Sequence, residues 1–171
     1  MMRATRKPAL VLVAEDDPDD CLLVREAWEE NRLVSVLRFV SDGEELTDYL
    51  RRSGRYALPA PAPRPDLILL DLNMPRKDGR EALKEIKSDP ALRQIPVVVL
   101  TTSQSEEDVS RSYDLGVNSF IVKPAAFDKI VELVRELNTY WFETVELARE
   151  KENGGPTPRP GGRRRDGPHP T

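Results

Sequence analysis

Four groups of polar residues in the sequence could act together on a charged substrate. Glu15 and Asp16 follow one short apolar run, and Asp71, Thr101 and Lys123 each lie at the end of a later one. If these runs are parallel strands, their carboxyl ends share one edge of a sheet, where ligands of such sheets bind. Carboxylates crowded at that edge repel one another and need protonation, a cation or both.

The residue types favour a hard cation and a phosphoryl group. His169 is the only histidine and Cys21 the only cysteine, so a histidine-based triad, a phospho-accepting histidine and an intrachain disulfide are excluded. Oxygen ligands without histidine or cysteine suit Mg²⁺ or Mn²⁺. A lysine opposite such a cation would complete a receptacle for a phosphoryl group.

The elements that must position these groups alternate along the chain. Apolar runs predict five strands, and helical periodicity with caps at Asp17 and Gly116 predicts five helices. The expected strands are 9–14, 35–40, 67–70, 97–100 and 119–122, and the expected helices are 19–30, 44–52, 80–88, 105–115 and 127–151. Several strands are apolar on both faces, which is typical of parallel sheets covered by helices. The expected fold is therefore an α/β, doubly wound five-stranded parallel sheet with an extended C-terminal helix.

Composition divides the 171 residues into an N-terminal arm at 1–8, a domain at 9–152 and a tail at 153–171. The tail holds glycines, prolines and four arginines, and it predicts disorder because it lacks apolar side chains. The rest of the chain is acidic, which makes it a poor general binder of nucleic acid. No export signal or spanning segment is apparent, so we expect no membrane contact and a cytoplasmic location.

The motifs together resemble the receiver domain of bacterial two-component response regulators, over about residues 10–137. The resemblance is carried by Glu15-Asp16, Asp71-Leu72-Asn73-Met74-Pro75 with Asp78-Gly79, Thr101-Thr102, and Phe120-Ile121-Val122-Lys123-Pro124. It implies a flavodoxin-like (βα)5 receiver fold.

The resemblance also implies roles for individual residues. Asp71 would accept a phosphoryl group from the phosphohistidine of a sensor histidine kinase. Mg²⁺ would be bound by Asp16, the Asp71 carboxylate and the main-chain carbonyl of Asn73, with Glu15 reaching it through water.

Further implied roles concern the switch. Thr101 and Lys123 would contact the phosphoryl oxygens, and Phe120 would repack when Thr101 moves. The Lys123–Pro124 bond is expected to be cis, as is usual in the family. Thr102, Ala125 and a phenylalanine at position 120 depart from the commoner residues, which leaves the lifetime of the phosphorylated state open.

These features favour a stand-alone receiver that signals by protein–protein contact, without a DNA-binding domain and without being a turnover enzyme. One alternative is a Mg²⁺-dependent phosphatase with an aspartyl nucleophile. That chemistry generally uses a second aspartate two residues later, where this chain has Asn73. The other alternative is nucleic-acid binding through the arginine-rich tail.

The last predicted helix is longer than the sheet requires. An apolar stripe should face the sheet, formed by Phe127, Ile130, Val131, Val134, Leu137 and Trp141. Apolar residues then continue at Tyr140, Phe142, Val145, Leu147 and Ala148. We expect these residues to form the interface of a homodimer. The alternative is that they fold back against their own domain.

The partner is suggested by resemblance. The long last helix, the proline-rich segment 58–65 and the acidic run 16–20 resemble the small response regulators that partner bacterial phytochromes. The expected partner is therefore a sensor histidine kinase of the phytochrome type. The resemblance also implies that the homodimer forms through the fourth helix, fifth strand and fifth helix, as is common in those regulators.

Overall fold

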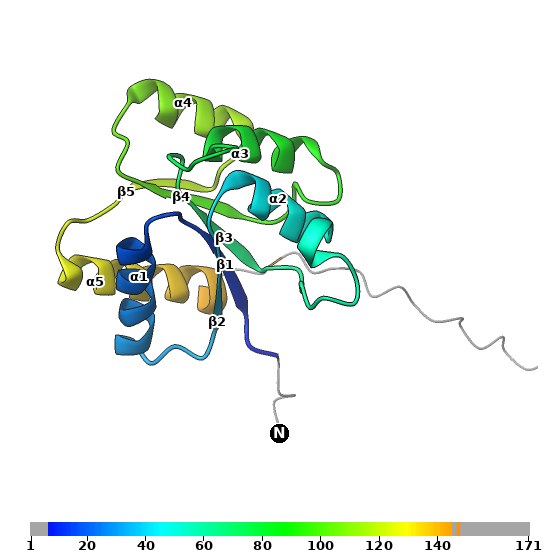
Figure 1. Cartoon of the computed structure of the whole chain (residues 1–171). Coiled ribbons are helices and arrows are strands. Elements are labelled where there is room, and N and C mark those ends of the chain that lie inside the picture. Colours follow the sequence, from blue (N-terminus) through cyan, green and yellow to red (C-terminus); the bar gives the residue numbers. More distant parts are fainter. Residues whose placement is uncertain (1–6, 145–146, 148–171) are drawn as a thin grey trace, which may run out of the picture.

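A parallel sheet of five strands forms the centre of the molecule (Figure 1). The computed structural model describes residues 7–144 and 147. The strands are β1 (Leu10–Ala14), β2 (Val36–Val40), β3 (Leu67–Leu70), β4 (Val97–Thr101) and β5 (Ser119–Val122). Their order across the sheet is β2-β1-β3-β4-β5, and every neighbouring pair is parallel. The expected fold class is confirmed.

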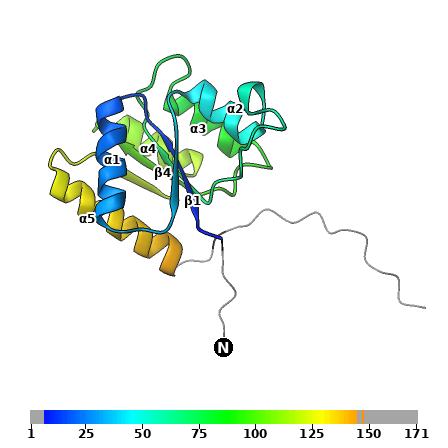
Figure 2. The same ribbon diagram turned by 60° about the horizontal axis from the view of Figure 1, so that its bottom comes forward.

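Five helices cover both faces of this sheet. They are α1 (Pro18–Glu30), α2 (Gly43–Arg51), α3 (Gly79–Ser88), α4 (Glu106–Leu115) and α5 (Phe127–Asn138), and a short 3₁₀ turn spans Gly54–Tyr56. Helices α1 and α5 lie on one face, and α2, α3 and α4 lie on the other (Figures 1 and 2). Because helices shield both sides, every residue of β1, β3 and β4 is buried.

Two apolar layers result from this arrangement. One layer packs α2 and α3 against the sheet, with Leu46, Tyr49 and Leu83 fully buried. The other packs α1 and α5 and contains both tryptophans of the chain, Trp28 and Trp141, each less than 10% exposed. The indole N–H of Trp28 donates to the Ser35 hydroxyl at 2.9 Å, which satisfies its polar atom inside the layer.

Local capping sets where the helices begin. The Asp17 carboxylate accepts from the Asp19 N–H, and the Ser105 hydroxyl accepts from the Asp108 N–H. Gly116 ends α4 with φ at 102°, a left-handed conformation that favours glycine. The expected caps at Asp17 and Gly116 are confirmed.

The start of α3 is brought unusually close to the end of β3. The Gly79 N–H donates to the Leu72 carbonyl at 2.9 Å. A Cβ at Gly79 would lie 2.2 Å from the Asp71 carbonyl oxygen, a distance that no side chain can adopt. The Asp78-Gly79 pair therefore holds α3 directly against the backbone of Asp71.

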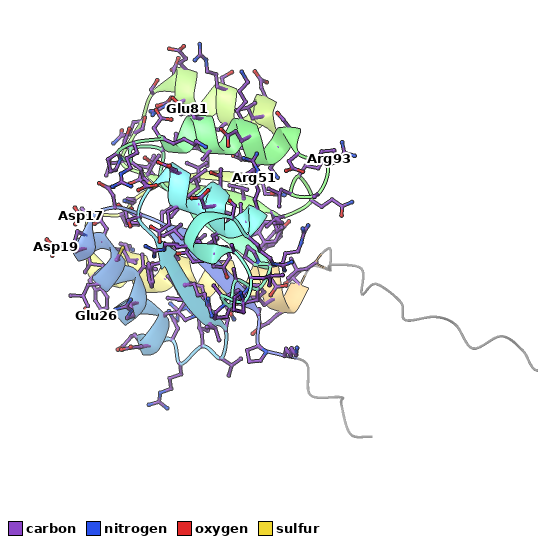
Figure 3. The ribbon with its side chains drawn as sticks, turned by 45° about the vertical axis from the view of Figure 1, so that its right-hand side comes forward. Asp17, Asp19, Glu26, Arg51, Glu81 and Arg93 are labelled. Atoms are coloured by element: carbon purple, nitrogen blue, oxygen red, sulfur yellow. The ribbon has the colours of Figure 1, made fainter. Side chains whose placement is uncertain are left out.

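Charged side chains occupy the outer faces of the helices. Four of the exposed residues labelled in Figure 3 lie on helices, namely Asp19, Glu26, Arg51 and Glu81. The other two, Asp17 and Arg93, are exposed in the loops before α1 and after α3. No helix within residues 7–144 is long and apolar enough to cross a membrane.

The C-terminal helix differs from the prediction of one α-helix over 127–151. The α-helix ends at Asn138, and the chain continues as a π-helical segment over Thr139–Thr144. Residues 145–146 and 148–151, and the predicted tail at 153–171, lie outside the described residues. The wider π turn changes how successive side chains are rotated around the helix axis, which a regular 3.6-residue pattern does not anticipate.

The apolar residues of this helix are placed partly as predicted. Trp141 is 7% exposed and packs with Ile130 and Val134 in the α1–α5 layer, as the stripe predicted. Phe127 is 40% exposed, so its placement on the sheet-facing stripe is wrong, because it is the first residue of the helix. Phe142 and Leu147 pack partly against the same layer, which favours the alternative in which these residues fold back onto their own domain.

Candidate functional site

The predicted polar residues meet at the carboxyl ends of four neighbouring strands. Glu15 follows β1, Asp71 follows β3, Thr101 ends β4 and Lys123 follows β5. The Lys123 ammonium donates to the Glu15 carboxylate and, at 3.0 Å, to Asp71 Oδ2. The Thr101 hydroxyl donates to Asp71 Oδ1 at 2.8 Å. The carboxylate of Asp71 therefore lies between a cation and a hydroxyl.

This cluster is nearly closed to solvent, and its charges perturb one another. Glu15 is 5% exposed, Asp71 is 6% exposed and Thr101 is fully buried. Burial raises the pKa of Glu15 to about 7, and the nearby Asp71 charge adds to the rise while Lys123 opposes it. Burial also acts to raise the pKa of Asp71, but hydrogen bonds from Asn73, Thr101 and Lys123 outweigh it and lower that pKa.

The lysine is held in its charged form. Burial acts to lower the pKa of Lys123, but hydrogen bonds to Glu15 and Asp20 exceed that effect and raise the pKa above its usual range. Lys123 therefore remains an ammonium ion at all physiological pH values, which suits a group that must neutralise an anion.

Three carboxylates form an oxygen cluster beside the lysine. Glu15, Asp16 and Asp71 each offer one oxygen, and these atoms all lie within 4.8 Å of one another. Glu15 and Asp71 are buried, while Asp16 is exposed and leaves the cluster open on that side. A set of hard oxygen donors with excess negative charge fits a divalent cation such as Mg²⁺ or Mn²⁺.

Asn73 lies next to Asp71 in the loop after β3. Its backbone N–H donates to Asp71 Oδ1 at 3.0 Å. Two donors, Asn73 from this loop and Thr101 from the end of β4, therefore converge on one carboxylate oxygen. The structure thus brings together the predicted site residues Glu15, Asp16, Asp71, Asn73, Thr101 and Lys123.

Phe120 lies apart from this cluster, on β5. It is half-buried, and its side chain packs against the α2–α3 layer. Its backbone N–H donates to the Tyr113 hydroxyl of α4 at 3.2 Å. The hydroxyl of Tyr113 on α4 thus binds the backbone of β5 at Phe120. Position 120 is where the family more commonly has a tyrosine.

One expectation about the backbone is wrong. Within the described residues, the cis peptide bond is Leu58–Pro59, and Lys123–Pro124 is not cis. The preference for trans before proline is only about 0.5–1 kcal/mol, so sequence alone does not fix which proline bond is cis.

Asp20 is a member of the cluster that the sequence interpretation did not identify. Its Oδ2 accepts a hydrogen bond from Lys123 Nζ at 2.9 Å, and its side chain is one-third exposed. The available signal was its place in the first turn of α1, since this turn begins at the same sheet edge at which β1 ends.

A second polar network lies on the other side of Asp71 and was also missed. The guanidinium of Arg80 on α3 donates two hydrogen bonds of 2.6 Å to Asp108 on α4. The Ser103 hydroxyl, from the loop after β4, donates to the same carboxylate at 2.7 Å. The hydrogen bonds from Arg80 lower the pKa of Asp108 to about 2. No spacing in the sequence indicates this contact, because its members come from different elements.

The sheet order and the groups at its edge define a class of protein. A parallel sheet ordered β2-β1-β3-β4-β5, with an acidic pair, an aspartate, a hydroxyl and a lysine at successive strand ends, is the architecture of a two-component signal receiver. The chain belongs to the response regulator receiver domain family, whose model matches residues 11–135.

Its relatives include response regulators of phytochrome systems. The chain is 42% identical to the response regulator Rcp1 of Synechocystis sp. over 147 residues, which cover 86% of this chain and 98% of Rcp1. The phosphorylated cyanobacterial phytochrome response regulator RcpA is 45% identical in sequence and matches with a TM-score of 0.78, over 84% of this chain and all of RcpA. The Mn²⁺-bound form of Rcp1 matches with a TM-score of 0.76 at 42% identity, over 83% of this chain and all of that one.

Proposed function

We propose that this protein is a phosphorylation switch in which Asp71 accepts a phosphoryl group from a sensor histidine kinase. Membership of the receiver family implies phosphoryl acceptance, and the placement of Asp71 supports this residue as the acceptor. Asp71 is the buried carboxylate that is contacted at once by Lys123, Thr101 and the Asn73 backbone. This convergence on one carboxylate is the observation that carries the proposal.

The residues supply what phosphoryl transfer requires. An oxygen of Asp71 attacks phosphorus, the P–N bond of the donor phosphohistidine breaks, and the imidazole leaves with the bonding electron pair. Lys123, fixed 3.0 Å from Asp71 Oδ2, offsets the negative charge of the incoming phosphoryl oxygens. Asp16, Asp71 and the Asn73 main-chain carbonyl would hold Mg²⁺, with Glu15 reaching it through water. The cation would supply the remaining charge neutralisation between the two anions.

The proposed switch depends on two alternative hydrogen-bond acceptors for the Thr101 hydroxyl, namely the Asp71 carboxylate and a phosphoryl oxygen. The hydroxyl now donates to Asp71 Oδ1, and after phosphorylation it would donate to a phosphoryl oxygen instead. The movement would open space next to β5 into which the half-buried Phe120 can turn. A single modification would thereby bias a packed element between two positions. This makes the protein a signalling switch rather than a turnover enzyme, with the functional unit at residues 9–152.

The proposed donor is a phytochrome-type histidine kinase. Support comes from RcpA, which is described as a cyanobacterial phytochrome response regulator. The similarity covers all of RcpA and 84% of this chain.

We also propose a homodimer that uses α4, β5 and the start of α5. Three apolar side chains on these elements are each at least 40% exposed, namely Tyr113, Val122 and Phe127. Trp141, which lies in the α1–α5 layer, is buried and takes no part. Light scattering should give a dimer for the wild type and a monomer for Val122→Glu with Tyr113→Glu. A monomeric wild type at micromolar concentrations would refute the dimer.

The phosphoryl-acceptor assignment is tested with acetyl phosphate and a magnesium salt. Mass spectrometry should find one added phosphoryl group on the wild type and none on Asp71→Asn, because an amide is not a nucleophile here. Asp114→Asn, an exposed aspartate on α4, is the matched control and should be phosphorylated normally. Uptake by Asp71→Asn at the wild-type rate would refute the assignment, and continuous release of phosphate would identify a phosphatase instead.

A further inference from the structure

Two loops border Asp71, and both aim a hydrogen-bond donor at the same oxygen. The loop after β3 supplies the Asn73 N–H at 3.0 Å from Oδ1, and the end of β4 supplies the Thr101 hydroxyl at 2.8 Å. The direction in which the carboxylate points is therefore set by the separation of these two loops.

Arg80 bridges the two loops on the side away from Lys123. Toward the loop after β3, its Nη1 lies 3.4 Å from the Leu72 carbonyl and its Nη2 lies 3.5 Å from the Asn73 side-chain oxygen. Toward the loop after β4, its Nε and Nη2 bind both oxygens of Asp108 at 2.6 Å. Its position is in turn fixed by α3, which begins one residue earlier against the Asp71 backbone.

Asp108 carries the connection from Arg80 to Thr101. Its Oδ2 accepts from the Ser103 hydroxyl at 2.7 Å, and the Ser103 N–H lies 3.4 Å from Thr101 Oγ1. The Asp108 side chain is only 13% exposed, and two-pronged binding by a guanidinium fixes both distance and orientation. A continuous set of polar contacts thus runs from Asn73 through Arg80, Asp108 and Ser103 to Thr101.

We propose that Arg80 is a positioning residue for phosphoryl transfer, which acts with Asp108 to hold the two loops at the separation that orients Asp71. The proposal rests on the assignment of Asp71 as phosphoryl acceptor. Arg80 itself touches neither the carboxylate of Asp71 nor Lys123 in the hydrogen bonds of the described residues, so its effect must pass through Asn73 and Thr101.

Loss of Arg80 should slow phosphoryl uptake much more than it weakens the binding of acetyl phosphate or Mg²⁺. Small displacements of reacting groups lower rates strongly, so Arg80→Ala should reduce the maximal rate of phosphoryl uptake by roughly tenfold. The acetyl phosphate concentration for half-maximal rate should change by less than about twofold, because Lys123 is untouched. The Mg²⁺ affinity should fall by much less than the rate, because the carboxylates of Glu15 and Asp16 are untouched although Asn73 and Asp71 are displaced.

A double-mutant cycle separates positioning from a loss of general stability. The maximal uptake rate is measured for Arg80→Ala, for Asp108→Ala and for the double variant, with the melting temperature recorded under the same conditions. If the two residues act as a unit, the double variant is no slower than the slower single variant. Arg80→Lys keeps the charge but loses the two-pronged geometry, so it should recover only part of the rate.

Arg55→Ala is the matched control, because this arginine of the 3₁₀ turn is 71% exposed and pairs with Glu45 at 2.6 Å, outside the Arg80–Asp108 network. Its uptake rate should equal that of the wild type. The inference is overturned if Arg80→Ala reacts at the wild-type rate, if the two single effects multiply, or if Mg²⁺ affinity falls as much as the rate. The wild type and Asp71→Asn are assayed alongside, so failure of the acceptor assignment itself would be recognised separately.

Discussion

The two polar networks on either side of Asp71 differ in their charge balance. On one side the single ammonium of Lys123 faces three carboxylates, those of Glu15, Asp20 and Asp71. On the other side the guanidinium of Arg80 meets the carboxylate of Asp108 in a paired geometry, with Ser103 completing the acceptor. Arg80 also lies 3.6 Å from the carboxylate of Asp78, so one guanidinium faces two carboxylates. The Lys123 network, with three carboxylates to one ammonium, therefore carries the larger excess of negative charge.

The difference in charge suits the Lys123 cluster to a reaction and the Arg80–Asp108 pair to stabilising the scaffold. Buried carboxylates without enough cations are costly, and such a cluster persists where a ligand or a reaction requires it. The Arg80–Asp108 pair, in the first turns of α3 and α4, is joined by two short hydrogen bonds and stabilises the contact between these helices. The following predictions test the comparison by removing one member of each network, in order of expected effect.

Lys123→Ala should have the largest effect on stability. It leaves the buried carboxylates of Glu15 and Asp71 without their cation, and removing one partner of a buried charge pair costs about 3 kcal/mol or more. Urea unfolding in the presence of a chelator measures this loss. Mg²⁺ at about 100 times its dissociation constant should restore up to about 2.7 kcal/mol.

The control for that change is Lys129→Ala, since Lys129 is 61% exposed and pairs only with Glu132 at 3.4 Å. Its effect on the unfolding free energy should stay within about 0.5 kcal/mol. In Lys123→Ala we expect phosphoryl uptake to persist in part while its coupling to the switch is lost, so partner binding should no longer respond to acetyl phosphate. Equal stability of Lys123→Ala and wild type would contradict the charge imbalance.

Asp16→Asn should have an intermediate effect, on Mg²⁺ affinity. The change removes one formal negative charge from the three-carboxylate cluster, and we expect the affinity to fall about tenfold. Isothermal titration calorimetry measures it directly. Asp19→Asn is the control, because Asp19 projects outward from the same end of α1 (Figure 3). An unchanged affinity for Asp16→Asn would place the metal elsewhere.

Asp108→Asn should have the smallest effect, and one that depends on pH. The pKa of Asp108 in the folded protein is about 2, below its ordinary value of 3.8, so its ionised form stabilises the fold. That contribution is complete above the ordinary pKa and is lost as the pH falls toward 2. At neutral pH we expect the free energy of unfolding of the variant to be about 1 kcal/mol lower than that of the wild type. The value is kept small because Arg80 is 36% exposed and solvent screens the ion pair.

Urea unfolding of both proteins as the pH is lowered provides the check. The gap in unfolding free energy between wild type and Asp108→Asn should narrow below about pH 4. A gap that widens on acidification would show that the ion pair does not account for the depressed pKa.

The fold and most of the site were predictable from the sequence because both follow from strand positions. Once apolar runs are assigned as parallel strands, the residues after them must share one edge. Glu15, Asp71, Thr101 and Lys123 are confirmed there, since a strand end fixes its next residue to within about one position. Local rules also sufficed for the caps at Asp17 and Gly116.

The contacts between helices were not predictable in the same way. Arg80 and Asp108 meet only because α3 and α4 lie side by side, and their separation of 28 residues has no periodic meaning. The end of the last helix was also missed, because the pattern around Trp141 fits an α-helical stripe as well as a π-helical turn. Tertiary packing, rather than local preference, decides such features.

The position of the two tryptophans determines what their fluorescence can report. Trp28 and Trp141 are both enclosed in the α1–α5 layer, and the charged cluster at the strand ends includes neither. Their emission should be that of indoles shielded from water and should shift sharply when this layer opens. It should therefore follow global unfolding while staying nearly constant during metal binding, so an optical probe of phosphorylation requires an indole placed elsewhere, for instance at the exposed Thr102 beside Thr101.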